Sequence, residues 1–437
     1  MSGEVPRMTD YATVTEYLYA LKASSGVKFG IDRMQHLVEV LNHPERSYPV
    51  IHVAGTNGKG SVSAMLESIF RAAGFRTGLY TSPHLVKLGE RVQVDRQLLT
   101  EAEIVAYTAE LKPAAEAIGK RSPDENPTFF EFMTAMAFLQ FQRKGVDLAV
   151  IEVGMGGRLD ATNVVRPAVS VITSIGLDHC AELGDTLEKI AREKAGIIKP
   201  DCPVVMGRLP PEAEAVIREV AAANHARVYS VREEFGEASS NYPSTNLEGT
   251  YQRWNAATAV LVARILEPRF KIDEPAISRG LQAVNWPGRW QRATVGGKKL
   301  ILDASHNPEG VQTLEENLRK LVAETGRKPV IVAGALGEFR AKALLGVVSR
   351  YAKEIHLITP KQARATPFDE MLALIPDESK KMVYRATVDS VFPDSERCAI
   401  GESGDTVVVT GSIYLLGEVL ERIEPGRGAG EGWLQDF

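Results

Sequence analysis

The sequence predicts an α/β protein of two domains, each built on a doubly wound, mostly parallel sheet. The chain has 437 residues, more than one hydrophobic core normally organises, so two domains are expected. Short apolar runs alternate with segments of helical periodicity along nearly the whole chain. Continuous apolar strands that alternate with helices are typical of a parallel sheet covered by helices on both faces.

The first series of elements begins with a buried strand that runs into a glycine-rich loop. After this loop, apolar residues recur three, four and seven positions apart, which predicts a helix over residues 61–74 that stops at Gly74. A second, strongly apolar helix is predicted over residues 128–145. Apolar, β-branched runs predict strands at residues 49–55, 75–82, 147–154 and 168–176.

The pattern breaks at residues 285–299, where NWPGRWQRATVGGKK holds two Trp, one Pro and three Gly without periodicity. Such a stretch is typical of a domain boundary or a corner. We place the division after residue 291, with an N-terminal domain of the phosphate-loop type (1–291) and a smaller, Rossmann-like domain (292–437). A fresh series of strands supports the second domain, at residues 299–305, 329–336, 354–360, 381–386 and 405–411.

Composition excludes several classes of function. The formal net charge is −5, so no basic field favours nucleic acid or an anionic membrane. No apolar run reaches the roughly 18 residues of a membrane span. The chain has three cysteines, far apart and without a C-x-x-C pair, which disfavours a disulfide framework or a thiolate zinc site. A reducing cytoplasm is the expected location.

The stretch VAGTNGKGS, residues 53–61, has the composition of a phosphate-binding loop but departs from the common G-x-x-x-x-G-K-[ST] spacing. Its place between a buried strand and an amphipathic helix directs backbone N–H groups and a helix dipole at one point. Lys59 adds a charge for the β- and γ-phosphates, and Ser61 a hydroxyl near Mg²⁺. A simple turn would also suit Gly-Thr-Asn-Gly. The candidate nucleotide-binding residues of the loop are Gly55, Thr56, Asn57, Gly58, Lys59, Gly60 and Ser61.

Polar residues also follow three other predicted strands. Ser82 lies in TSPHL, Glu152 ends the strand before a glycine-rich turn, and His179 follows Asp178 in SIGLDHC. Ligands of open α/β sheets bind beyond the carboxyl ends of the strands, and a carboxylate there is a natural Mg²⁺ partner. The glycines after Glu152 fail the dinucleotide fingerprint, because Leu159 occupies the third glycine position, and this disfavours NAD.

The motifs AGTNGKGS, TSPHL, EVGMGGRLDATN, TSIGLDH, REKAGI, WNAATA, PGRWQ and DASHNP occur in this order. Together they resemble those of the folylpolyglutamate synthases, often bifunctional with dihydrofolate synthase, within the wider Mur ligase group. The resemblance spans residues 27–417, and the short phosphate loop is the form that this family shows. It implies an ATP-dependent ligase, in which a folate or dihydropteroate carboxylate becomes an acyl phosphate that L-glutamate then attacks.

The resemblance also implies roles for individual residues. It assigns catalysis to Lys59, Glu152, His179 and Lys194, and two Mg²⁺ sites to Ser82, Glu152 and His179. Lys194 is carbamylated in the family, whereas its spacing alone indicates only a solvated lysine on a helix. The remaining nucleotide-binding residues that it implies are Asn255 near the adenine, Arg289 at the phosphates, and Asp303 and His306 beside the cleft. Asn255 also suits a helix N-cap before an apolar helical run.

On the substrate side, the resemblance is less specific. Asp160 matches a pterin-site residue, and Phe129 and Phe130 match an aromatic loop that stacks on a pterin ring, although both also suit a hydrophobic core. Arg91 is a candidate for binding a substrate carboxylate. Ser82 and Ser412 complete the predicted substrate-binding set.

Three other functions were weighed. A Mur-type ligase that acts on a cell-wall precursor normally carries an additional N-terminal domain, and too little chain precedes Gly55 for it. A non-catalytic nucleotide switch fits less well with the second domain and its Asp303 and His306. A dehydrogenase is the weakest alternative. The expected enzyme is a monomer, and the sequence leaves open whether both synthase activities coexist.

Overall fold

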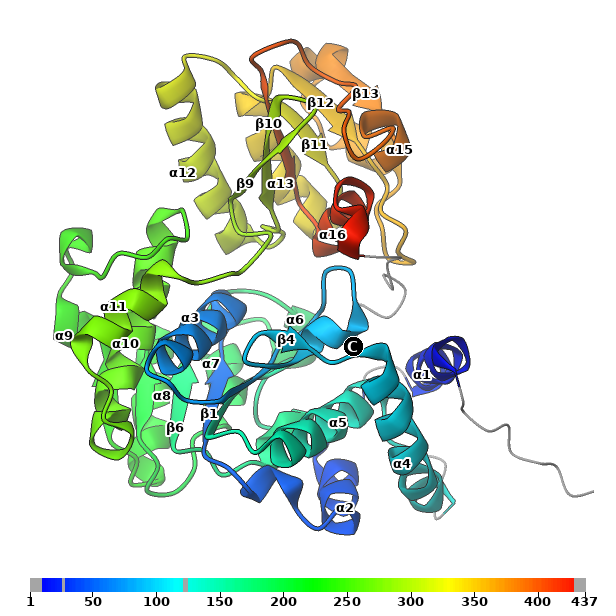
Figure 1. The fold of residues 1–437 in the computed structure, drawn as a ribbon. Coiled ribbons are helices and arrows are strands. Elements are labelled where there is room, and N and C mark those ends of the chain that lie inside the picture. Colours follow the sequence, from blue (N-terminus) through cyan, green and yellow to red (C-terminus); the bar gives the residue numbers. More distant parts are fainter. Residues whose placement is uncertain (1–9, 26–27, 121–124, 428–437) are drawn as a thin grey trace, which may run out of the picture.

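The structure is a computed structural model that describes residues 10–25, 28–120 and 125–427, and it contains two sheets in two stacked units (Figure 1). The first sheet has the strand order β4-β3-β2-β5-β1-β6-β7-β8. Its strands are parallel except for β3 and β4. Their bounds are β1 (Val50–Ala54), β2 (Thr77–Tyr80), β3 (Val92–Val94), β4 (Gln97–Leu98), β5 (Leu148–Glu152), β6 (Val169–Ile172), β7 (Val204–Met206) and β8 (Val228–Ser230).

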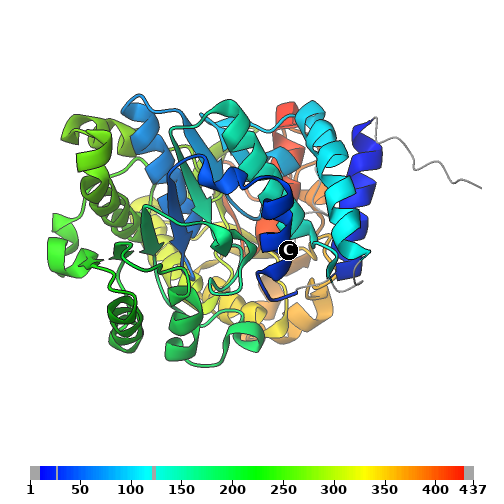
Figure 2. The ribbon, with the colours of Figure 1, turned by 90° about the horizontal axis from the view of Figure 1, so that it is seen from below.

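Helices cover both faces of this sheet, as the view from below shows (Figure 2). One face packs against α3 (Lys59–Ala72), α10 (Thr250–Phe270) and α11 (Glu274–Gln282). The opposite face packs against α1 (Tyr11–Ser25), α2 (Asp32–Val40), α4 (Glu101–Gly119), α5 (Phe129–Lys144), α7 (Leu187–Ala195) and α8 (Pro211–Ala223). Two short helices, α6 (Cys180–Leu183) and α9 (Val231–Phe235), complete the unit. The residues of β1 alternate between the two cores, with Val50 in one and Ile51 in the other.

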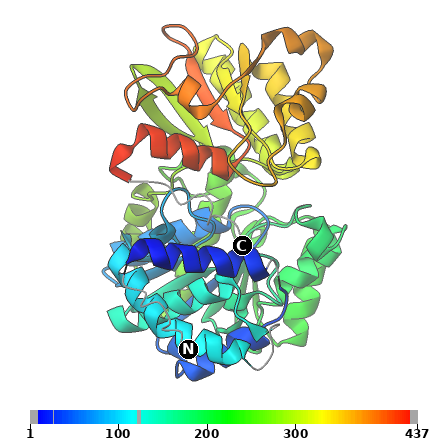
Figure 3. The same ribbon diagram turned by 90° about the vertical axis from the view of Figure 1, so that its right-hand side faces the viewer.

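The second sheet has the order β13-β12-β11-β14-β10-β9, in which only β9 is antiparallel to its neighbour. Its strands are β9 (Gln291–Val295), β10 (Lys298–Asp303), β11 (Val330–Ala333), β12 (Glu354–Leu357), β13 (Val383–Arg385) and β14 (Thr406–Thr410). Its helices are α12 (Pro308–Thr325), α13 (Glu338–Tyr351), α14 (Phe368–Ala373), α15 (Val388–Val391) and α16 (Ile413–Ile423). The view in Figure 3 shows this unit above the first, with α16 at the junction.

The predicted fold class is confirmed: both sheets are largely parallel and both are covered by helices on two faces. Strand β9 lies inside residues 285–299, which the sequence indicated only as a corner. It is an edge strand whose residues alternate between half-buried and exposed, so it carries no continuous apolar run. The proposed domain division after residue 291 falls at its first residue.

Two further findings bear on the sequence-based expectations. Cys180, Cys202 and Cys398 are free thiols in the described structure. Among residues 10–25, 28–120 and 125–427, no helix combines the length and apolarity required to cross a membrane.

Candidate active site

The glycine-rich loop connects the end of β1 to the start of α3, as predicted, and two of its glycines allow close approaches. Gly58 has φ +84°, and a Cβ there would lie 2.5 Å from the side-chain oxygen of Asn255. A Cβ on Gly60 would lie 2.5 Å from a ring carbon of Trp286, which belongs to the segment between the two sheets. One part of the departure from the common loop pattern, the glycine between Lys59 and Ser61, therefore has a local cause: residue 60 must leave room for Trp286.

Two lysines converge on this loop. The Nζ atoms of Lys59 and Lys194 both donate to the backbone oxygen of Gly55, at 3.1 and 2.9 Å. Burial, together with the charge of Lys59, lowers the pKa of Lys194 to about 7. The lysine of α7 is thus buried beside the loop and not solvated as its spacing indicated. Two amines and the N-terminus of α3 at one point make a site suited to an anion.

The strand ends bring a carboxylate to the same place, because β2, β5, β1 and β6 are neighbours in the sheet. Glu152, the last residue of β5, is 4% exposed, and burial raises its pKa to about 7. The backbone N–H of Ser82 donates to Glu152 Oε2 at 3.3 Å. The hydroxyl of Ser82 is buried and has no hydrogen-bond partner within the described part of the chain.

These residues fit a hard divalent cation. A buried carboxylate and an unpartnered hydroxyl supply oxygen ligands, and burial lowers the pKa of His179 to about 4, which keeps the imidazole in its neutral, ligating form. In the described residues no group of three or more His, Cys, Asp or Glu side chains is arranged as a metal site. That finding is compatible with Mg²⁺, which commonly takes one or two carboxylates and completes its shell with water and substrate phosphates.

Residues at the carboxyl ends of strands in the second unit lie on the other side of the same site. His306 follows β10, Ser412 follows β14 and caps α16, and Arg289 lies in the connecting segment. Together with the first unit they line a cavity of about 390 Å³, which we call the central cavity. The predicted site residues that line it are Gly55, Thr56, Asn57, Gly58, Lys59, Gly60, Ser82, Glu152, His179, Lys194, Arg289, His306 and Ser412.

A second cavity of about 200 Å³, the Trp254 cavity, shares Asn57, Gly58, Arg289 and His306 with the central one. Ser61, Asn255 and the aromatic rings of Tyr251 and Trp254 line it, and Arg208 lies over the Trp254 ring at 4.7 Å. The two cavities therefore lie next to each other, one beside the aromatic rings and the other beside Lys59 of the glycine-rich loop. An extended ligand with a flat ring and an anionic end suits this shape.

The interpretation of Asn255 as a helix N-cap was wrong. Helix α10 starts at Thr250, so Asn255 lies inside its second turn, where its side chain donates to Gln252 Oε1. The sequence pattern does not indicate this earlier start, because the first turn of α10, with Gln252 and Arg253, is polar. Nor does it indicate Tyr251 as a site residue, since an aromatic next to a helical run is usually a core residue. Arg208 joins the cavity through its contact with the Trp254 ring.

Asp303 does not line either cavity. Its carboxylate is 1% exposed and accepts hydrogen bonds from the backbone N–H groups of Trp290, at 3.1 Å, and Ser305, at 3.0 Å. Burial raises its pKa. Asp303 therefore holds the connecting segment that carries Arg289, and its predicted place at the nucleotide stays a prediction.

The predicted substrate residues are divided between the interior and a small cavity. Phe130 and Asp160 line a cavity of about 50 Å³, the Phe130 cavity. Phe129 and Arg91 are buried instead: the guanidinium lies 5.1 Å from the centre of the Phe129 ring, and its Nε donates to His84 Nδ1. Arg91 lines neither the central, the Trp254 nor the Phe130 cavity, because its side chain is buried against His84 and Phe129.

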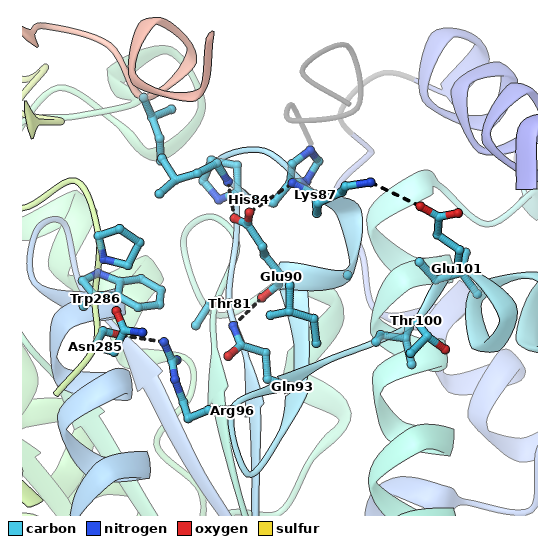
Figure 4. Close-up of a pocket in the computed structure, with 18 of the residues that line it drawn as sticks. Thr81, His84, Lys87, Glu90, Gln93, Arg96, Thr100, Glu101, Asn285 and Trp286 are labelled. Carbon is cyan, nitrogen blue, oxygen red and sulfur yellow. Dashed lines mark hydrogen bonds and ion pairs between the residues drawn. The ribbon is translucent and has the colours of Figure 1, made fainter. Parts of the chain in front are cut away.

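A further cavity, of about 520 Å³, lies beside the β3–β4 hairpin and we call it the hairpin cavity (Figure 4). Figure 4 shows Trp286 and Arg96 on one side of it and Thr100 and Glu101 on the other. It adjoins the central cavity, because both are lined by Pro83, Trp286, Arg289 and Ile413. The sequence did not reveal it, since its walls come from segments that are far apart along the chain.

Comparison with known proteins shows which family the chain resembles over both of its units. The model of the Mur ligase middle domain matches residues 53–256, and that of the Mur ligase glutamate ligase domain matches residues 288–413. A dihydrofolate synthase/folylpolyglutamate synthase of Bacillus subtilis is 35% identical over 91% of this chain and 96% of its own.

Two solved structures resemble the whole chain. Escherichia coli FolC in complex with DHPP and ADP is 30% identical, with a TM-score of 0.81 over 97% of this chain and 100% of its own. A bifunctional folylpolyglutamate synthase/dihydrofolate synthase with Mn, AMPPNP and L-glutamate bound is 30% identical, with a TM-score of 0.79 over 96% and 99% of the two chains.

Proposed function

Because this chain belongs to the Mur ligase family, among its folylpolyglutamate and dihydrofolate synthases, we propose that it is an ATP-dependent ligase that joins L-glutamate to a folate. Dihydropteroate is the second proposed acceptor, since relatives of this length carry both names. The observation that carries the proposal is the central cavity, where Lys59, Glu152 and Ser82 of one unit face His306 and Ser412 of the other.

The residues of the cavity suit phosphoryl transfer followed by amide formation. Lys59 and the amides of the loop hold the phosphates of ATP, while the Trp254 cavity takes the adenine. A carboxylate oxygen of the acceptor attacks the γ-phosphorus, and the bond to ADP breaks. The amine of L-glutamate then attacks the acyl carbon, loses a proton, and phosphate leaves. Such transfers depend mainly on positioning and on neutralised charge.

Mg²⁺ is the proposed ion, with Ser82 and Glu152 at one site and Glu152 with His179 at a second. The ion supplies charge neutralisation at the phosphates. For the acceptor, we propose that the Phe130 cavity, with Asp160 on its wall, receives the pterin end. The Phe130 ring can stack on a flat heterocycle, and the carboxylate can accept from its N–H groups.

Lys194 is proposed to carry a carbamate. Only a neutral amine attacks CO₂, with formation of an N–C bond and loss of a proton, and a pKa of about 7 makes that form available at neutral pH. The product is an anion beside Lys59, which would replace the repulsion between two ammonium groups with attraction.

We expect Lys194→Ala to lower turnover by about 100-fold, and a short carboxylate such as acetate to restore part of it. In the unchanged protein, the neutral fraction of Lys194 rises from about a tenth at about pH 6 to about nine tenths at about pH 8. The carbamate signal in ¹³C NMR with labelled bicarbonate should therefore grow with pH over this range. Absence of both the rescue and the signal would reject the carbamate.

Location and assembly are also proposals. Three free thiols support a reducing cytoplasm. A monomer is supported by the origin of the cavity, because both sheets that line it belong to one chain.

The function is tested by supplying ATP and Mg²⁺ with L-glutamate and, in separate reactions, tetrahydrofolate or dihydropteroate. ADP and phosphate should be released only when both acceptor and L-glutamate are present, and mass spectrometry should show a product that has gained one glutamate. ATP hydrolysis that proceeds equally without an acceptor would favour a nucleotide switch. Turnover with only one acceptor would define which synthase activity the chain has.

A further inference from the structure

Five polar side chains join the two units directly at the central cavity. Asn57, in the glycine-rich loop, and Asp178, next to His179, belong to the first unit. Asn307 and Glu309, at the start of α12, and Arg340, in the first turn of α13, belong to the second. We call this set the interdomain latch. In the sequence, Asn307 before Pro308 is typical of a helix start, and Asn307 Oδ1 indeed accepts from the backbone N–H of Gly310 as an N-cap. The contacts across the two units are not visible in the sequence.

One half of the latch holds the glycine-rich loop. Asn57 Nδ2 donates to Glu309 Oε2 at 2.6 Å, and Asn307 Nδ2 donates to Asn57 Oδ1 at 2.9 Å. The backbone of Asn57 is fixed from the other side, because its carbonyl accepts from the hydroxyl of Thr173 at 2.7 Å. The conformation of the loop at Asn57 is therefore determined jointly by both units.

The other half holds the loop that carries His179. Arg340 Nη2 donates to Asp178 Oδ1 at 2.7 Å, and Asn307 Nδ2 donates to Asp178 Oδ2 at 3.0 Å. The side chains of Arg340 and Asp178 are 22% and 12% exposed, so the ion pair is largely withdrawn from water. The same Asp178 Oδ1 accepts from the backbone N–H of His179. Asp178 thus links the guanidinium of the second unit to the backbone of a proposed metal ligand.

We propose that the interdomain latch positions the reacting groups of the ligase, with Arg340 as its main positioning residue. When the second unit closes, its contacts fix two side chains at the same time. One is Asn57 of the phosphate loop, and the other is Asp178, which precedes His179. An open cleft lacks these contacts, so ATP can bind to the loop without the full arrangement for phosphoryl transfer. Closure that completes a site in this way is a common means of committing a substrate. This inference rests on the proposed function, and it adds Arg340, Asn307 and Asp178 as residues that act by holding other groups in place.

The test compares Arg340→Met with Arg350→Met as a matched control. Arg350 lies on the same helix and pairs with Glu315 at 3.0 Å, a contact within the second unit. We expect Arg340→Met to lower kcat by about 10- to 100-fold with less than about a threefold change in the KM for ATP. Arg340→Lys, which keeps the charge, should recover part of kcat, and Arg350→Met should stay within about twofold of the unchanged protein. A loss no larger than that of the control, or a raised KM with kcat unchanged, would overturn the proposal.

Small-angle X-ray scattering provides a readout that does not require turnover. The radius of gyration should fall when AMPPNP and Mg²⁺ are added to the unchanged protein and to Arg350→Met, and fall less in Arg340→Met. Equal compaction in all three proteins would also overturn the proposal. If Arg340→Met does not fold, Glu309→Ala, which removes the bond to Asn57, tests the other half with the same two readouts. If the unchanged protein shows compaction but no glutamate-dependent turnover, the proposed function fails while the scattering still decides whether the latch drives closure.

Discussion

Glu152→Gln is expected to reduce glutamate-dependent release of ADP by about 1,000-fold or more, because the amide cannot supply the charge that holds a divalent cation at the phosphates. Glu152 lies at the end of β5, buried, with the N–H of Ser82 on one oxygen. The change is nearly isosteric, so the melting temperature should stay close to that of the unchanged protein. Turnover is measured by coupled ADP release over a range of Mg²⁺ concentrations.

The pH dependence of ion binding provides a second measurement. The pKa of Glu152 is about 7, and a cation binds only the ionised carboxylate, so the proton competes below this value. Affinity for Mg²⁺ should therefore rise as pH increases through about 7 in the unchanged protein and lose most of this dependence in Glu152→Gln. Glu67→Gln is the matched control, since Glu67 is also buried but pairs with Arg71 on α3. Near-normal turnover of Glu152→Gln would show that the ion is held elsewhere.

Lys59→Met is expected to lower kcat/KM for ATP by about 100- to 1,000-fold, because it removes the charge that is proposed to hold the phosphates and retains most of the side-chain volume. Lys59 donates to the carbonyls of Gly55 and Thr56, which places its ammonium over the loop. Arginine is not expected to replace it, since the planar guanidinium cannot fold back onto these two carbonyls.

Lys199→Met is the matched control for this change. Lys199 also donates to a backbone carbonyl, that of Asn163 at 2.9 Å, in the same unit. It does not line the central cavity or the Trp254 cavity. ATP affinity, measured by calorimetry, should fall in Lys59→Met and remain in the control. Equal affinities for ATP in the two variants would show that Lys59 does not contribute to nucleotide binding.

The fold and the centre of the site were predictable because both depend on local pattern and on sheet order. Apolar runs such as 147–154 are long enough to identify as buried strands, and neighbouring parallel strands bring their carboxyl ends together. That rule is sufficient to place Ser82, Glu152 and His179 around one loop.

The remaining features depend on contacts between distant segments, which periodicity does not encode. Arg340 begins a helix of the second unit and resembles any surface cation until the two units are set side by side. Arg91 is the last residue of the polar motif GER, residues 89–91, yet it is buried, donates to His84 and lies against Phe129. The hairpin cavity likewise has walls from distant segments, among them residues of the β3–β4 region and the segment around Trp286.

The contact between Gly60 and Trp286 couples the effects of substitutions at two positions that are 226 residues apart in the sequence. A methyl group at residue 60 can be accommodated only if the indole gives way, so a larger residue at 60 is expected to require a smaller one at 286. The effect of changing residue 60 therefore cannot be transferred from one ligase to another without knowing which residue stands at 286. Engineering of the loop should accordingly begin with paired libraries at these two positions.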